Sequence, residues 1–208
     1  MATKFIRSLT SLLVSLAVVS QASAGLIVTN GDFEDLTGLT VQGGGWYNGV
    51  PAGWSGINTT YTVYDTGSTH VANLGQLAGD GSSPAFFLSQ SVGTTDVTGI
   101  VTLTFDLPAT FGSVYNVGAG IYAAPFTNGT NYAFAQFTGT GPQVLTTSSP
   151  VAAGTPLSVA FYLVTTPPVN APALDNVAIV QVPEPGTWAM LAGGMACAAL
   201  SCRRSRRA

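Results

Sequence analysis

Short runs in which apolar and polar residues alternate dominate residues 25–182. The alternation is clearest in residues 101–107, where Val, Leu, Phe and Leu are separated by Thr, Thr and Asp, and it recurs in residues 115–121, 132–137 and 157–163. Because successive side chains of a strand point to opposite faces, this period of two indicates strands with one buried face. No stretch of ten or more residues combines the helical period with helix-forming residues. The sequence therefore predicts an all-β body.

Clusters of Gly, Pro, Asn, Thr and Ser separate these runs and are typical of turns. About nine short strands at this spacing favour an antiparallel β-sandwich. No internal repeat or long linker divides residues 25–182, and a chain of this length can bury its own core. We therefore expect one domain. The expected strands are residues 26–29, 60–64, 70–74, 85–91, 101–107, 115–121, 132–137, 157–163 and 173–182.

Basic residues are confined to the two ends of the chain. None of the six Lys and Arg residues lies between Ser8 and Cys202, and residues 25–182 carry eight acidic residues. A nucleic-acid-binding surface needs a cationic patch, and a phosphorylated substrate needs cationic or other anion-binding groups. The composition therefore argues against nucleic-acid binding and against a Lys or Arg phosphate clamp. It also makes a bound cation a natural partner for some of the acids.

The N-terminal residues 1–24 have the three parts of a secretory signal peptide. Lys4 and Arg7 precede an apolar run from Leu9 to Val19, and Ala22-Ser23-Ala24 provides a small-residue cleavage site. The apolar run is too short for an ordinary membrane helix, which needs about 20 residues. We therefore expect an exported protein whose mature chain begins near Gly25.

The C-terminal residues 183–208 also have three parts. Pro183-Glu184-Pro185 is followed by 16 small and apolar residues from Thr187 to Cys202, and then by a cluster of arginines. The apolar run is near the lower limit for a transmembrane helix, and the arginines behind it favour a cytoplasmic end. Together with the signal peptide, this arrangement predicts a single C-terminal transmembrane helix that anchors an exported body in the inner membrane.

This ordered arrangement at the end of the chain resembles a PEP-CTERM sorting signal. The resemblance implies recognition by an exosortase, a membrane-embedded cysteine transpeptidase, with processing near the Pro-Glu-Pro. It also implies delivery to the cell surface or extracellular matrix of a Gram-negative bacterium that makes exopolysaccharide. It describes sorting and leaves the role of residues 25–182 open. The motif residues are Pro183, Glu184, Pro185, Arg203, Arg204, Arg206 and Arg207.

Three short motifs in the body resemble those of carbohydrate-binding-module-like, galactose-binding-like jelly rolls. They are Asn30-Gly31-Asp32-Phe33-Glu34, Gly53-Trp54 and Leu174-Asp175-Asn176-Val177. The resemblance implies a jelly roll whose first and last strands run near each other. It also implies a structural calcium ion held by Glu34, Asp175 and backbone carbonyls. Asn176 stands where a second Asp is common in that family, which lowers the local charge.

The charge balance supports the calcium hypothesis separately. Two unpaired carboxylates such as Glu34 and Asp175 would repel each other, whereas a divalent cation between them would attract both. Calcium prefers six to eight oxygen ligands from carboxylates and carbonyls. Two alternatives remain open, namely that both acids are solvated or that Asp175 caps a turn.

Catalytic groups are sparse in residues 25–182. His70 is the only histidine, and no Gly-x-Ser-x-Gly motif supplies a nucleophile for a serine hydrolase. Both cysteines, Cys197 and Cys202, lie in the apolar tail, so neither a disulfide framework nor a zinc site is expected in the body. Paired carboxylates could serve a glycosidase, but chain spacing does not establish their separation in space. We therefore predict a protein that is not an enzyme.

Three aromatic residues are candidates for ligand contacts. Trp46, Tyr47 and Trp54 flank Gly-rich sequence, and aromatic rings on loops offer flat apolar surfaces to sugars. The alternative for Trp54 is a place in the core, which large aromatic side chains favour. Two functional hypotheses follow. One is a non-catalytic surface or matrix protein associated with exopolysaccharide and biofilm, and the other is a module that binds a glycan.

Overall fold

The computed structural model describes residues 25–56, 60, 62–74, 88–110, 116–126, 130–163 and 172–184. Within these residues every named element is a strand. None of these residues belongs to a helix long and apolar enough to cross a membrane. The predicted signal peptide and the predicted transmembrane helix with its arginine cluster lie outside the described residues. The expected all-β body is confirmed.

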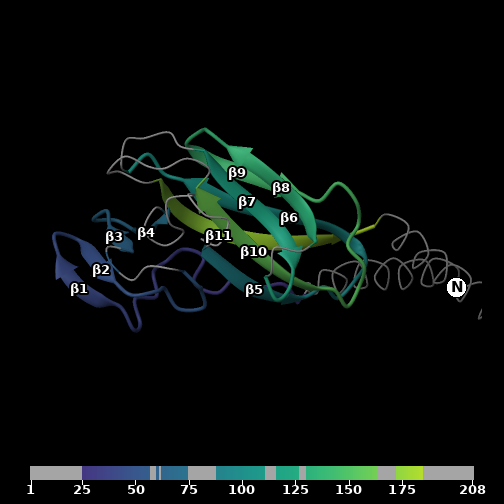
Figure 1. The fold of residues 1–208 in the computed structure, drawn as a ribbon, viewed down its shortest axis with the longest axis horizontal. Coiled ribbons are helices and arrows are strands. Elements are labelled where there is room, and N and C mark those ends of the chain that lie inside the picture. The colour runs from purple at the N-terminus through teal and green to yellow at the C-terminus, as the bar shows by residue number, and fades with distance from the viewer. Residues whose placement is uncertain are drawn as a thin grey trace, which may run out of the picture.

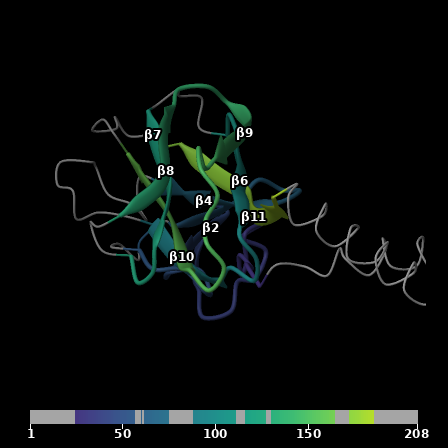
Figure 2. The same ribbon diagram turned by 90° about the vertical axis from the view of Figure 1, so that its right-hand side faces the viewer.

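The described strands form two antiparallel sheets (Figure 1). The larger sheet has the order β1-β2-β3-β4-β11-β6-β9, and the smaller sheet has the order β5-β10-β7-β8. Figure 2 shows β6, β9 and β11 on one side and β7, β8 and β10 on the other. The strands are β1 (Thr40–Gly43), β2 (Trp46–Asn48), β3 (Val63–Asp65), β4 (His70–Asn73), β5 (Leu88–Thr94), β6 (Gly99–Leu107), β7 (Val117–Ala123), β8 (Asn131–Phe137), β9 (Gly141–Thr146), β10 (Pro156–Leu163) and β11 (Ala173–Pro183).

The two sheets pack together through the inward faces that the alternation predicted. In β6, every second residue is buried from Gly99 to Leu107. Phe105 of β6 meets both Phe161 of β10 and Phe137 of β8 with ring centroids 5.1 Å apart, so aromatic contacts join the two sheets. Each fully buried side chain of this size stabilises the fold by about 1.5–3 kcal/mol. The largest are Phe33, Phe105, Phe161, Leu74, Leu88, Leu103, Ile121, Leu157, Leu163, Leu174 and Val63.

The structure differs from the predicted strands near the N-terminus. Residues 26–29 contain only one isolated bridge, between Leu26 and Gly93, and not a strand. β1, β2 and β9 were not predicted. All four residues of β1 are exposed. β9 alternates between less exposed and exposed positions, but the apolar Val144 is exposed beside the buried Leu145, so its sequence shows no alternation of apolar and polar residues.

The last strand lies inside the larger sheet, between β4 and β6. β11 pairs with β4 through Ala173 and Leu174, and with β6 from Asp175 to Pro183. It therefore crosses the boundary expected between residues 182 and 183. Val177 of β11 also donates its backbone N–H to Gly31 O at 2.8 Å. The early and late sequence motifs are thus in direct contact.

Candidate functional site

The turn that contains the first motif is closed by its own side chains. The Asn30 amide bonds to both backbone groups of Asp35, accepting from the N–H at 2.9 Å and donating to the carbonyl at 3.1 Å. Asn30 and Phe33 both have positive φ, at 50° and 54°. This conformation is uncommon for residues other than glycine, and Asn tolerates it best. The first motif therefore has a structural role in shaping this turn.

Trp54 is part of the core beside this turn. Its side chain is 7% exposed, and its indole Nε1–H donates to Asn30 O at 3.0 Å. Its ring stacks on Phe33 at 5.5 Å and also contacts the ring of Phe161. Because its ring faces are covered by other rings, we assign Trp54 to the core and do not retain it as a ligand contact.

Glu34 is engaged by the only histidine. Its Oε1 accepts the backbone N–H of His70 at 2.8 Å, and its Oε2 lies 2.6 Å from His70 Nδ1. These contacts lower the pKa of Glu34, and the side-chain hydrogen bond with His70 has the largest effect. The edge of the His70 ring meets the Tyr47 ring with centroids 5.6 Å apart. The pair ties the N-terminal turn to β4.

Asp175 is a buried acid at an irregular point of β11. The residue is 6% exposed, its Oδ1 accepts the N–H of Asn176 at 2.7 Å, and it lies opposite Asp106 of β6. Burial raises the pKa of Asp175 to about 6; the bond from Asn176 opposes the rise, and the charges of Asp106, Glu34 and Asp32 add to it. Asp106 in turn accepts the Asn176 side-chain amide at 2.8 Å.

The predicted calcium ligands Glu34 and Asp175 are hydrogen-bonded to different partners, His70 and Asn176. Within the described part of the chain no group of three His, Cys, Asp or Glu residues is arranged to hold an ion. Glu34 is turned to His70, although its charge still acts on Asp175. Sequence reasoning missed Asp106, because it occupies an outward position of an alternating strand and looks like any exposed polar residue.

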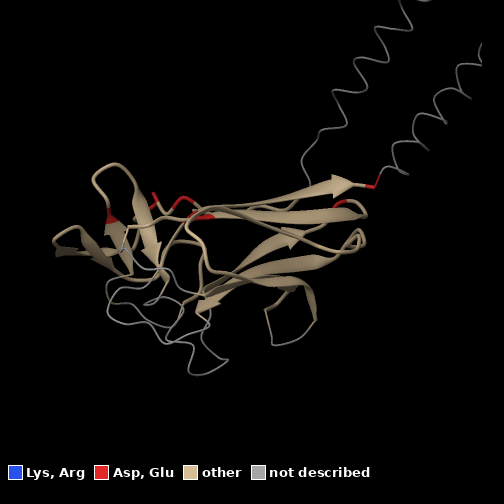
Figure 3. Cartoon of the chain, turned by 90° about the horizontal axis from the view of Figure 1, so that it is seen from above, with Lys and Arg blue, Asp and Glu red and all other residues tan. Residues whose placement is uncertain are grey.

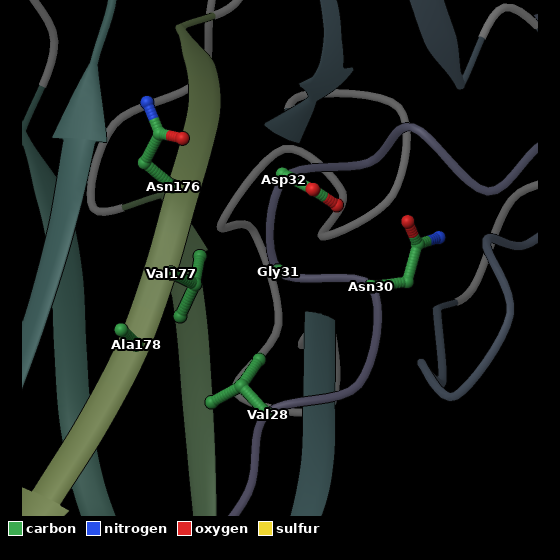
Figure 4. Close-up of a pocket in the computed structure, with 7 residues that line it drawn as sticks. All are labelled: Val28, Asn30, Gly31, Asp32, Asn176, Val177 and Ala178. Atoms are coloured by element: carbon green, nitrogen blue, oxygen red, sulfur yellow. The ribbon is translucent and has the colours of Figure 1, made fainter.

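A shallow depression of about 480 Å³ lies between β11 and the N-terminal turn (Figure 4). Figure 4 shows Asn30 and Asn176 on opposite sides of it, with both amides directed toward the top of the view and not at each other. The Asn30 and Asn176 amides are also both hydrogen-bonded within the protein. The polar groups do not converge, so we assign no ligand to this depression. Its lining residues are Val28, Asn30, Gly31, Asp32, Asn176, Val177 and Ala178.

Trp46 and Tyr47 do not share a surface. They are neighbours in β2, so their side chains point to opposite faces of the sheet. Trp46 meets Tyr64 with ring centroids 4.6 Å apart, whereas Tyr47 meets His70. Both residues are partly exposed. The structure therefore offers two separate aromatic pairs in place of one platform.

The end of β11 carries the start of the C-terminal motif. Pro183 pairs with Gly99, and the Glu184 N–H donates to Thr98 O at 3.4 Å. Pro185 and the four arginines of the predicted signal lie outside the described residues. Figure 3 shows acidic residues and no Lys or Arg over the described part of the chain.

Comparison with known proteins decides the nature of this C-terminal segment. Residues 181–207 match the PEP-CTERM protein-sorting motif. The motif implies export, membrane anchoring and exosortase processing in Gram-negative bacteria. The predicted sorting signal is thereby confirmed, and the match begins two residues earlier than expected. No curated protein matches the chain.

Several solved structures resemble the body in outline. Bacteriophage CBA120 tailspike protein 4 aligns with TM-score 0.42 and 15% identity over 76% of this chain and 22% of its own. A Xyl-CBM35 in complex with a glucuronic acid containing disaccharide aligns with TM-score 0.37 and 22% identity over 64% of this chain and 90% of its own. The xylan-binding module CBM15 aligns with TM-score 0.39 and 15% identity over 65% of this chain and 95% of its own.

Proposed function

We propose that this protein is an exosortase-sorted, non-catalytic component of the cell surface or extracellular matrix, associated with exopolysaccharide and biofilm. The observation that carries the proposal is the sorting motif at residues 181–207, which begins within the last residues of β11. A signal peptide at residues 1–24 would start export, and the inner membrane would hold the protein until it is processed.

The surroundings of the titratable groups support a body without catalytic activity. His70 is held by Glu34 and Tyr47, contacts that tie two segments of the fold together. The acids Asp106 and Asp175 lie on adjacent paired strands, and Asn176 bonds to both. These contacts give the groups structural roles.

Cell fractionation tests this proposal. In a strain that makes exopolysaccharide, we expect the protein in the surface or matrix fraction, and we expect it to stay in the inner membrane when the exosortase is deleted. A strain that makes no exopolysaccharide serves as the second comparison, and there the protein should leave the matrix fraction. An unchanged distribution in both strains would overturn the proposal.

A second candidate function is glycan binding through the Trp46–Tyr64 pair. Two aromatic rings 4.6 Å apart on adjacent strands offer a broad apolar surface of the kind that covers sugar rings. Tyr47, the other candidate from the sequence, lies on the opposite face with His70 and provides a matched control.

A structural calcium ion also remains a proposal, centred on Asp175. Its carboxyl group is buried among the charges of Asp106, Glu34 and Asp32, and a divalent cation would offset that repulsion. Because ion binding to the folded state stabilises it, calcium should raise the Tm at pH 7.5 relative to EDTA. The same comparison on Asp175→Asn should show a smaller difference. Identical wild-type melts in both buffers would remove calcium from the account.

A further inference from the structure

The sorting motif begins inside a β-sheet. Gln181, Val182 and Pro183 of β11 face Val101, Ile100 and Gly99 of β6 in antiparallel register. The motif match starts at residue 181. The first residues of the matched motif are therefore also the last residues of β11, an interior strand of the larger sheet.

Pro183 fits this strand because of its place in the register. Gly99, its partner, exchanges both backbone hydrogen bonds with Val151 on its other side, at 3.0 and 2.7 Å. Neighbouring positions of an antiparallel pair alternate between bonded and non-bonded, so Pro183 stands where no N–H is required. A proline is tolerated at such a position without loss of a ladder bond.

Two further contacts hold the end of the strand. The Gln181 side chain donates from Nε2 to Val97 O at 2.5 Å, and Glu184 N–H donates to Thr98 O at 3.4 Å. The fit to Gly99 is tight, because a Cβ built there would lie 2.2 Å from Val182 O. The pairing thus extends to the Pro-Glu of the motif.

Burial does little to hold this end in place. Ile179 is the last buried residue of β11, while Val180 and Val182 are 53% and 56% exposed. β4 pairs only with Ala173 and Leu174, so β6 is the one described strand that pairs with the end of β11. Strand ends held by few buried contacts can open locally while the rest of the sheet stays folded.

We propose that residues 181–184 must separate from β6 before the exosortase can act, so that this pairing limits the rate of processing. The inference rests on the proposed sorting by an exosortase. An enzyme that cleaves a chain has to accept the backbone around the cleaved bond, and cleavage of paired backbone proceeds through a locally opened state. In this protein the hydrogen-bonded pairing with β6 occupies one edge of the backbone at the start of the motif.

A disulfide between the two strands tests the proposal in the full-length exported chain. The positions are Val182→Cys and Ile100→Cys, which face each other across a hydrogen-bonded pair with an expected Cα separation of about 5.5 Å, suitable for a disulfide. Val180→Cys with Thr102→Cys is the control, because it is the same kind of pair and lies just before the motif. Both variants keep Cys197 and Cys202. Mass spectrometry verifies each bond and reports whether the Arg tail is removed.

We expect the disulfide between positions 182 and 100 to reduce tail removal at least tenfold, and we expect reductant to restore it. The control disulfide between positions 180 and 102 should leave tail removal as in the wild type. Gly99→Ala, which crowds Val182 O, should accelerate processing several-fold. Removal of the tail from the bonded Val182–Ile100 variant at the wild-type rate would overturn the proposal while leaving sorting intact. A wild-type chain that keeps its tail beside an active exosortase would overturn both.

Discussion

At the scale of single residues, Gly31 shows why the first sequence motif contains a glycine. A Cβ built on Gly31 would lie 2.1 Å from Val177 O, a backbone atom that no rotamer change can move. Val177 also donates its N–H to Gly31 O. An added methyl group would therefore crowd the contact between the N-terminal turn and β11 and weaken its hydrogen bond.

We predict that Gly31→Ala lowers the free energy of unfolding by about 2–4 kcal/mol, as expected for overpacking combined with a weakened hydrogen bond. Urea denaturation of the purified body measures this. Gly139→Ala is the control, because the nearest atom to a Cβ there is the Gln143 amide at 3.9 Å, and it should change stability by about 0.5 kcal/mol or less. Equal losses of stability in Gly31→Ala and Gly139→Ala would contradict a specific contact between Gly31 and Val177.

Asp175 predicts a pH dependence of stability. Its pKa is raised to about 6 in the folded state, against about 3.9 for an unperturbed Asp. The stability that this group contributes is therefore fully present below about pH 4 and is lost as the pH rises through about 6. Asp175→Asn keeps an acceptor for the Asn176 N–H and removes the charge.

At pH 8 in EDTA, we expect Asp175→Asn to be more stable than the wild type by on the order of 1 kcal/mol, after allowance for solvent screening. The difference should shrink toward pH 4. Glu34 adds an opposite trend, because its lowered pKa gives stability that is present above the unperturbed Glu value of about 4.3 and is lost as the pH falls through the lower folded value. Taking the difference between wild type and variant isolates Asp175, and a difference independent of pH would contradict this assignment.

At the scale of elements, β2 places two candidate aromatic residues on opposite faces, which separates their roles. If the Trp46–Tyr64 pair binds glycans, Trp46→Ala should reduce binding on a glycan array at least tenfold, whereas Tyr47→Ala should leave it within about twofold. Loss of one stacking aromatic costs about 1–3 kcal/mol in analogous base-stacking sites. Equal losses in the two variants would point to a general effect on β2, and a blank array for the wild type would remove this candidate function.

The strands also differ in how well the sequence predicts them. Alternation located β6, which has one buried face, and β10, whose larger apolar residues alternate although most of the strand is buried on both faces. It missed β1, whose residues are all exposed and held only by their pairing with β2. Which strands pair with each other depends on the topology of the sheet, and local periodicity does not reveal it. The same period of two does separate Trp46 from Tyr47, because adjacent residues of a strand face opposite ways.

The candidate site was predictable only in part. Contact between the first motif and the last strand was expected and is present through Gly31 and Val177. The partner of Glu34 was not expected, because His70 is 36 residues away and reaches Glu34 only through the position of β4. Buried acids such as Asp175 acquire their properties from neighbours brought together by the fold, so their shifted pKa values have no local signature.

At the scale of the whole molecule, the body and the sorting signal share one strand. β11 is an interior strand of the larger sheet, and its last residues belong to the match at residues 181–207. With no separate linker between them, folding of the body and presentation of the motif depend on the same residues. The fold of the body and the accessibility of the sorting motif are therefore coupled, unlike in a protein whose sorting signal follows a separate linker.

The most direct test of exosortase sorting is the mass of the mature surface protein. Mass spectrometry of the protein recovered from cells that contain the exosortase should show a C-terminus near Pro183-Glu184-Pro185, with the arginine tail removed. A strain without the exosortase should retain the tail. A mature surface protein that still carries the intact sequence from Arg203 to Ala208 would contradict the account.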